Sequence, residues 1–335
     1  MKTQRTPSIR RGFTLMELIV AMAITTIIVT VLVSITSMAL DTWNRSRSEL
    51  RASRQAKSMI DTMARDFESL VVRKSNTNEW LSAVVETTAE MAKIGDNIKS
   101  TNASKLVFFT AATDRYDGEL NGADGIAGNS DDPAGDVSCV AYELKYRDPI
   151  GASGSVNTFV LNRLLVNPDD TFRDLLGMTD STKPAQSLKS VFFTPTYQAK
   201  LSDPAKFICE NIFQFSLTFH VQVTVPGVGV APATVINIPV SVGQASSAQI
   251  AQSFVIHGNG IMANISGGAV TSAQLASGRI TAVEISVTVL SDFGVEQQKK
   301  RVFTSTSGKT VDQVKAEFIA KHSYDYSKLV QLPTM

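Results

Sequence analysis

Residues 10–17 read Arg-Arg-Gly-Phe-Thr-Leu-Met-Glu, and the 23 residues that follow, from Leu18 to Leu40, carry no charged side chain. A run of this length is enough to cross the hydrocarbon core of a bilayer as a helix. At about 1.5 Å per residue it measures about 35 Å, which leaves room for some tilt. The stretch therefore predicts a membrane-spanning helix that begins close to the N-terminus.

The residues before the apolar run are basic. They contain no acidic side chain before Glu17, and their bases are Lys2, Arg5, Arg10 and Arg11. By the positive-inside rule, a leader of residues 1–12 is expected to stay in the cytoplasm, and the chain after Leu40 is expected on the other side of the membrane.

The position of a cleavage site distinguishes this N-terminus from a secretory signal, which is cut after its apolar core at a site of small residues. Here Ser37-Met38-Ala39 is the nearest such site and is a poor match. The Gly12–Phe13 junction lies before the core instead. Cleavage at this junction would remove the basic leader and leave the helix attached to the rest of the chain.

Gly12, Phe13, Thr14, Leu15 and Glu17 together resemble the N-terminus of type IV prepilins and type II secretion pseudopilins. The resemblance implies that a prepilin peptidase cuts between Gly12 and Phe13, with N-methylation of Phe13. It also implies that Glu17 pairs with the N-terminal amine of a neighbouring subunit, or its own, during assembly. The alternative for Glu17 is a carboxylate that reaches the membrane interface in a simple signal anchor, because an unpaired charge in hydrocarbon is costly.

The same resemblance implies the location and the partners of the protein. The location is the bacterial inner membrane, crossed once, with the N-terminus in the cytoplasm and the globular domain in the periplasm. The partners are the prepilin peptidase, other pseudopilins or pilins, an inner-membrane assembly platform and the lipid bilayer. Nucleic acid is not expected as a partner, because the net charge is only +1 and no basic patch with interleaved aromatic residues occurs.

The helix is expected to continue beyond Leu40. Apolar side chains recur at three- and four-residue spacings from Trp43 to Val71, and no Pro or Gly occurs between Phe13 and Val72. The pattern predicts one helix of about 60 residues, with a transmembrane and assembly half over 13–40 and an amphipathic half over 41–72 that covers a globular partner. Asp66 is assigned to an outer, polar face of this helix. Core packing explains the Met and Phe side chains, so no cofactor is required.

Strand patterns dominate the remaining 73–335, which is predicted to be a β-rich periplasmic domain. Predicted strands cover 105–111, 137–147, 158–166, 188–195, 207–225, 234–242 and 280–291. A turn at 292–294 and a returning strand at 300–306 would complete a hairpin. Helices are predicted near 79–92 and at 311–321, the second with Thr310 as its N-cap. A long helix followed by mostly antiparallel strands indicates an α+β, pilin-like fold.

Two C-terminal segments extend the resemblance. The segment 210–219 alternates aromatic and polar residues, and 280–289 reads Ile-Thr-Ala-Val-Glu-Ile-Ser-Val-Thr-Val. This order is similar to that in J-type minor pseudopilins and related minor pilins. The chain is longer than those proteins, with additional polar stretches at 114–136 and 244–278, and it also resembles the pseudopilin-like cassette proteins of Verrucomicrobia.

An acidic, glycine-containing stretch over 114–136 is a candidate calcium site. Many hard oxygens on a flexible loop suit Ca²⁺, and the candidate ligands are Asp114, Asp117, Asn121, Asp124, Asp131 and Asp132. The spacing does not follow the EF-hand pattern. The alternative is a solvated loop, because Asp, Asn and Gly are also the ordinary residues of turns.

Cys139 and Cys209 leave two alternatives open. In an exported protein they could form one disulfide. Both lie in apolar stretches, so they could equally be two buried thiols on separate strands.

No catalytic set is recognised in the sequence. His220, His257 and His322 are far apart and follow no zinc spacing, and neither G-x-S-x-G nor H-E-x-x-H occurs. The leading hypothesis is therefore a minor pseudopilin-like structural subunit of a periplasmic filament in a type II secretion-like system, and not an enzyme. One alternative is a minor subunit of a type IV pilus with an adhesive or ligand-binding domain. The other is a membrane-tethered periplasmic enzyme.

Overall fold

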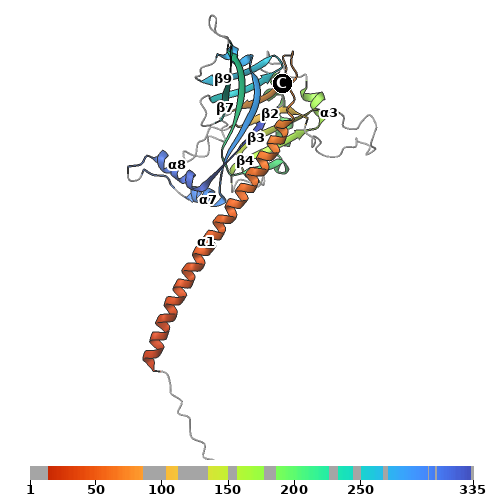
Figure 1. The fold of residues 1–335 in the computed structure, drawn as a ribbon. Helices are drawn as coiled ribbons and strands as arrows, with labels where there is room; N and C mark the ends of the chain where they lie inside the picture. The colour runs from red at the N-terminus through yellow and green to blue at the C-terminus, as the bar shows by residue number, and fades with distance from the viewer. Residues whose placement is uncertain are drawn as a thin grey trace, which may run out of the picture. The chain divides into compact units, whose positions relative to one another are not determined.

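A computed structural model describes residues 14–85, 103–111, 135–149, 157–176, 186–225, 233–243, 250–266, 271–300, 302–305 and 308–332. The chain divides into two compact units, Met1–Glu49 and Leu50–Met335. One continuous helix, α1, runs from Leu15 to Glu68 and contributes to both (Figure 1). The prediction of a single long helix is confirmed, and its end at Glu68 falls four residues before the predicted one.

The described part of the first unit, residues 14–49, is the first part of α1. No glycine or proline interrupts it, so no backbone hydrogen bond of the ladder has to be given up. By length and composition, α1 contains a segment that can cross a membrane.

The second unit contains a sheet of 11 described strands. The strands are β1 (Glu79–Val84), β2 (Lys105–Thr110), β3 (Ser138–Arg147), β4 (Thr158–Val166), β5 (Phe207–Glu210), β6 (Ile212–Val225), β7 (Thr234–Val242), β8 (Ile250–His257), β9 (Gly260–Ser266), β10 (Arg279–Leu290) and β11 (Ser323–Gln331). Their order is β11-β10-β6-β7-β8-β1-β2-β3-β4-β5, and β9 pairs with β8. Pairing among these strands is antiparallel apart from the parallel pair β7–β8. The predicted α+β, pilin-like fold is confirmed.

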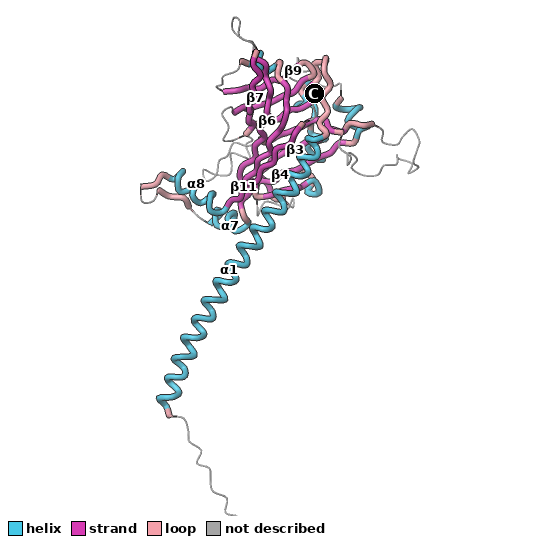
Figure 2. The backbone as a smooth tube through the Cα atoms, in the orientation of Figure 1, coloured by secondary structure: helices cyan, strands magenta, loops and turns pink. Residues whose placement is uncertain are grey.

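The second half of α1 forms the centre of the larger core. Ala56, Met59, Met63 and Phe67 are buried together with apolar side chains from strands along the sheet. Phe67 stacks on Phe108 of β2, with ring centroids 4.5 Å apart. Figure 2 shows this part of α1 beside the strands. The i, i+3, i+4 spacing of these residues places them on one helix face, which the sheet covers.

A second core lies on the opposite face of β1 to β4. The strands alternate between the two cores, since Phe108 belongs to the first and Val107 and Phe109 belong to the second. The helices α4 (Leu188–Phe192) and α5 (Pro195–Leu201) and the π-turn η2 (Thr171–Leu175) cover this face. Strands buried on both faces read as continuous apolar runs, as β2 does.

The remaining short elements connect the strands. They are α3 (Pro168–Asp170), η4 (Pro204–Lys206), α6 (Ser272–Ala276), α7 (Asp292–Lys300) and α8 (Val311–His322). Thr310 caps α8 through a reciprocal capping box with Gln313, which confirms its predicted role.

Asn211 separates β5 from β6 within what the sequence predicts as one strand. Its φ is 59°, in the left-handed region that Asn tolerates better than most residues. Thr158 donates to the Asn211 amide oxygen at 2.7 Å, and the amide nitrogen donates to Asp292 at 2.8 Å. This break allows β5 to pair with β4, while β6 pairs with β7 and β10.

The predicted strand at 188–195 is wrong, because α4 and the first residue of α5 occupy it. Ser187 accepts a hydrogen bond from the Ser190 backbone at 3.2 Å and so acts as a helix N-cap. The Glu79 carboxylate accepts another from the Leu188 backbone at 2.7 Å. The predicted helix near 79–92 is also wrong over its first part, where Glu79–Val84 is β1; residues 86–92 lie outside the described residues.

The predicted hairpin between 280–291 and 300–306 is wrong as well. Ser291 accepts a hydrogen bond from Gly294, and the helix α7 begins where a turn was predicted. The antiparallel neighbour of β10 is β11, whose Val330 lies opposite Val283. The hairpin β8–β9 also falls within a stretch that the sequence suggested to be a polar loop.

Candidate assembly site

Thr14 and Glu17 form a reciprocal capping box at the start of α1. The Thr14 backbone N–H and hydroxyl both donate to Glu17 Oε2 at 2.9 Å, and the Glu17 N–H donates to Thr14 Oγ1 at 3.3 Å. Such a box satisfies backbone donors that the first turn of a helix leaves free. A carboxylate at this end is also favoured by the helix dipole. The Thr-x-x-Glu spacing before an apolar run is the sequence signal for this role, which the sequence-based assignment of Glu17 omitted.

Threonine side chains of the apolar half, and Thr42 just after it, bond back to their own helix. Each hydroxyl donates to the carbonyl four residues earlier, at 2.7 or 2.8 Å; the donors are Thr25, Thr26, Thr30, Thr36 and Thr42. In hydrocarbon an unsatisfied polar group costs free energy, and these bonds remove that cost. The segment can therefore lie in lipid, or against other apolar helices, without a polar partner for these groups.

The apolar half of α1 exposes large hydrophobic side chains on all its faces. They include Leu15, Ile19, Ile27, Leu32 and Leu40, each more than half exposed. A helix that is hydrophobic all round needs lipid or other helices as its environment. This surface fits a helix that anchors the chain in a membrane by crossing it once.

A buried ion pair holds the other end of α1 to the sheet. Asp66 is 1% exposed, and Arg163 of β4 donates to its two carboxylate oxygens at 2.8 Å each. Tyr142 of β3 donates to the same carboxylate, and the Thr110 hydroxyl donates to the Asp66 carbonyl at 2.9 Å. The assignment of Asp66 to an outer face is therefore wrong. Sequence periodicity could not show this, because its partners come from three distant strands.

This arrangement shifts the pKa of two of its members. Burial, reinforced by the Asp66 charge, raises the pKa of Tyr142 well above its ordinary value. Burial alone would lower the pKa of Arg163, but the hydrogen bonds and charge of Asp66 raise it overall. A paired, hydrogen-bonded carboxylate is tolerated inside a protein, whereas an unpaired one is not.

A second, more exposed polar cluster involves the preceding turns of α1. Arg51 donates to Glu210 at 2.6 Å and to Asp292 at 3.3 Å, and Gln55 donates to Glu210 at 3.4 Å. The Arg51 side chain is 58% exposed, so solvent screens these pairs and their contribution to stability is small. These hydrogen bonds connect α1 to Glu210, next to the break between β5 and β6, and to Asp292, the first residue of α7.

Several predicted site residues lie outside the described residues. They are the processing residues Gly12 and Phe13, and the candidate calcium ligands Asp114, Asp117, Asn121, Asp124, Asp131 and Asp132. The calcium site therefore stays a prediction. Within the described ranges, no group of three or more His, Cys, Asp or Glu side chains is arranged to hold a metal ion.

Cys139 and Cys209 are free, buried thiols. Cys139 on β3 lies in the core beneath α4, and Cys209 on β5 lies in the core around α1, so they face opposite sides of the sheet. The strand β4 also runs between them. Of the two alternatives, the structure shows separate thiols and not a disulfide. Burial raises the pKa of both thiols, that of Cys209 to about 12.

Comparison with known proteins identifies the N-terminal segment. Residues 8–33 match the family model described as the prokaryotic N-terminal methylation motif. No curated protein and no solved structure gives a significant match. The matched residues include the Gly12–Phe13 junction, the capping pair Thr14 and Glu17, and the first part of the apolar helix. The β-rich unit lies outside the match.

Proposed function

From the premise that the chain is a type IV prepilin-like protein, we propose that it is a minor pseudopilin, a structural subunit of a periplasmic filament in a type II secretion-like system. The observation that carries the proposal is the construction of α1. The first part of its apolar half lies within the methylation motif, the whole apolar half exposes hydrophobic side chains, and one face of its later part is buried in the core of a β-rich unit. One element thus supplies both a membrane-soluble assembly helix and the spine of the globular unit.

Processing would change the chemistry at the start of α1. Cleavage after Gly12 would remove Lys2, Arg5, Arg10 and Arg11 and create a positively charged amine on Phe13. Both bonds from Thr14 use Oε2 of Glu17, so Oε1 can accept from a second donor. The new amine of a neighbouring subunit, or of the same chain, is the natural donor. Pairing would neutralise both charges in an apolar bundle, where an unpaired charge is costly.

Assembly would then exchange lipid for helix contacts around the apolar half of α1. Lipid tails are as apolar as Leu or Ile side chains, so this exchange gains little from the hydrophobic effect itself. Close packing between the helices and the pairing of Glu17 with an amine would make the helix bundle more favourable than the lipid environment. The threonine hydroxyls do not oppose the move, because their hydrogen bonds remain within the helix.

Proteins with this motif are processed by prepilin peptidase and assemble with other pilins as structural subunits, which favours the filament over a membrane-tethered enzyme. The basic leader supports an inner-membrane location with the globular unit in the periplasm, because the positive-inside rule keeps such a leader in the cytoplasm. A minor type IV pilus subunit with a ligand-binding domain is the second candidate. The β-rich unit contains a cavity lined by apolar and basic residues, which favours a ligand-binding domain.

The first test is intact mass and N-terminal sequencing of the protein from native membranes, with the prepilin peptidase present and deleted. The expected mature chain starts at Phe13, carries one added methyl group and is lost in the deletion strain. A chain that starts at Met1 in both strains would overturn the proposal. Mechanical shearing then separates the two candidates: a pseudopilin stays with the cell envelope, whereas a pilus subunit is released with surface filaments.

A further inference from the structure

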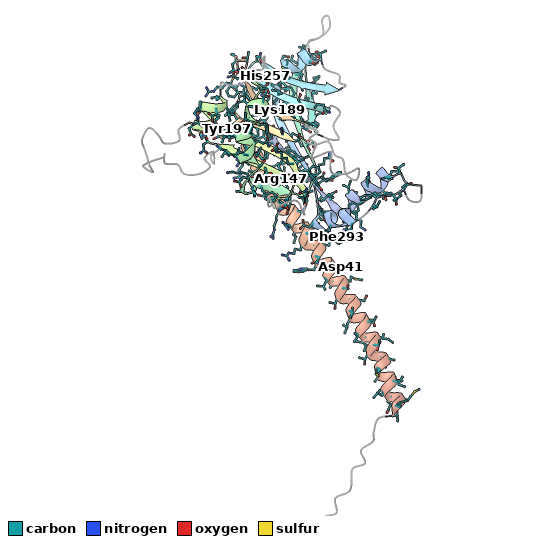
Figure 3. The ribbon with its side chains drawn as sticks, turned by 180° about the vertical axis from the view of Figure 1, so that it is seen from behind. Asp41, Arg147, Lys189, Tyr197, His257 and Phe293 are labelled. Atoms are coloured by element: carbon teal, nitrogen blue, oxygen red, sulfur yellow. The ribbon has the colours of Figure 1, made fainter. Side chains whose placement is uncertain are left out.

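A cavity of about 440 Å³ lies within the β-rich unit. It is bounded by the loop after α1, the turn between β8 and β9, and the segment from α6 to β10. Its apolar lining comes from Val72, Ile256, Ile261 and Ile280. His257, labelled in Figure 3, lies at the end of β8 and lines the same cavity.

His257 is the unexplained polar group of this cavity. It is 5% exposed, and neither imidazole nitrogen has a hydrogen-bond partner among the residues that the structure describes. Buried polar side chains in native proteins are as a rule hydrogen-bonded. Burial lowers the pKa of His257, so the ring is neutral at pH 7 and presents one donor and one acceptor.

Close backbone contacts that do not involve the His257 side chain hold the walls of the cavity in place. Ser75 donates to the Gly258 carbonyl at 2.9 Å, and Gly258 donates to the Asn78 carbonyl at 3.1 Å. A Cβ atom on Gly258 would lie 2.2 Å from the Asn76 side chain. A Cβ atom on Gly260 would lie 2.4 Å from the Ala276 carbonyl. The turn between β8 and β9 is therefore fixed against two neighbouring segments, and the cavity is a built feature of the fold.

The charges around the cavity have one sign. Lys74 and Arg279 are exposed lining residues, and the described lining includes no Asp or Glu. Glu79 lies opposite His257 in the β1–β8 pairing and does not line the cavity. Its carboxylate accepts a hydrogen bond from the Leu188 backbone. Two cations at an apolar cavity select an anionic group joined to an apolar body.

We propose that this cavity binds a small organic carboxylate with a short apolar chain. The carboxylate lies between Lys74 and Arg279, where His257 donates a hydrogen bond to it, and the chain contacts Val72, Ile261 and Ile280. The site does not depend on the filament role, and it gives the globular unit a ligand-binding function of its own.

The test uses the full-length chain in lipid nanodiscs with ¹⁵N-labelled histidine, since the chain has only 3 histidines. The probe is pentanoate, and pentan-1-amine is the control with the same chain and the opposite charge. Pentanoate is expected to shift the His257 ring resonances in a saturable way and to leave those of His220 and His322 unchanged. The His257→Gln variant assigns the affected signals.

Two variants test the role of charge. The double substitution Lys74→Gln and Arg279→Gln changes exposed side chains and is expected to weaken pentanoate binding at least tenfold, with His220 and His322 signals showing that the fold is kept. His220→Gln is the matched control, because His220 also has a buried nitrogen without a hydrogen-bond partner in the described part of the chain, but does not line the cavity. Its affinity is expected to be unchanged. The proposal is overturned by the absence of a saturable shift at His257, by an equal response to pentan-1-amine, or by unchanged affinity in the double variant.

Discussion

Asp66 of α1 and Arg163 of β4 are 97 positions apart in the sequence, yet they form a bidentate ion pair with both N–O distances at 2.8 Å. The pair lies next to Phe67, the residue by which α1 stacks on the sheet. In a protein whose assembly would act on one half of a helix, this contact fixes the other half to the globular unit.

Asp66→Asn is expected to destabilise the β-rich unit by about 3–5 kcal/mol, because it leaves Arg163 buried without a counter-charge. Urea unfolding followed by the fluorescence of buried Trp80, in a Trp43→Phe background, measures this change. Asp61→Asn is the matched control, because Asp61 is on the same helix but pairs with Lys328 at the surface. Its effect should stay below about 1 kcal/mol. Equal effects from the two variants would show that the buried pair has no special role.

The contribution of Tyr142 to the stability of the fold is expected to be lost at alkaline pH. Its pKa is raised in the folded protein, so the fold favours the protonated phenol. The contribution is fully present below the ordinary tyrosine pKa of about 10 and is lost as the pH rises beyond it. Tyr142→Phe should therefore be less stable than the parent at pH 8 and should lose less stability between pH 9 and pH 11. Parallel pH–stability curves for the two proteins would contradict this assignment.

Substitutions at Glu17 and Thr14 test helix capping and assembly separately. Glu17→Gln keeps a side chain that can complete the capping box but removes the charge, so the first turn should stay ordered while filament cross-linking falls. Thr14→Val removes the capping hydroxyl, at a cost of about 1 kcal/mol to the first turn, and keeps the carboxylate. Hydrogen exchange of the first turn and cysteine cross-linking between apolar helices report the two properties. If both variants lose cross-linking equally, capping and assembly are a single function of this turn.

Glu79 is a buried acid whose replacement should stabilise the protein. Burial raises its pKa, against the opposing effect of the hydrogen bond from Leu188. A raised pKa means that the fold favours the protonated acid, so ionisation costs stability as the pH rises through the ordinary glutamate range. Glu79→Gln can still accept from Leu188 and should raise the urea midpoint at pH 7, with a smaller gain at pH 4. A lower midpoint at pH 7 would show that the carboxylate charge at the start of α4 is required.

Because both thiols are free, the stability of the protein is expected to stay the same when a reductant is added. Cys139 and Cys209 should react with a maleimide only after unfolding, and dithiothreitol should leave the thermal midpoint unchanged. Mass spectrometry of the protein isolated from native membranes provides the direct check, since a disulfide lowers the intact mass by about 2 Da. A linked Cys139–Cys209 peptide would contradict the placement of the two residues on opposite faces of the sheet.

Structural features that depend on neighbouring residues could be predicted from the sequence. The uninterrupted α1, the strands β3, β4, β7 and β10, and the capped helix α8 each depend on residues within a few positions of one another. The methylation motif is equally local, and it accounts for the assignment to the prepilin class. Apolar periodicity, the absence of Gly and Pro, and short capping patterns act before any distant contact forms, so the sequence by itself determined these elements and the class of the protein.

Tertiary structure decided the features whose partners are distant. The 188–195 segment contains the strand-favouring residues Val191, Phe192 and Phe193, but Glu79, 109 positions away from Leu188, accepts from the first residue of the helix that forms there. Asp66 has the spacing of a polar outer face, yet Arg163 and Tyr142 neutralise and bond it in the core. The neighbour of β10 is β11 and not the next segment, and β4 separates the two cysteines. In the first two cases a hydrogen bond or ion pair between distant residues outweighed a local preference of a few tenths of a kcal/mol per residue. No local pattern records such a bond or the pairing of distant strands.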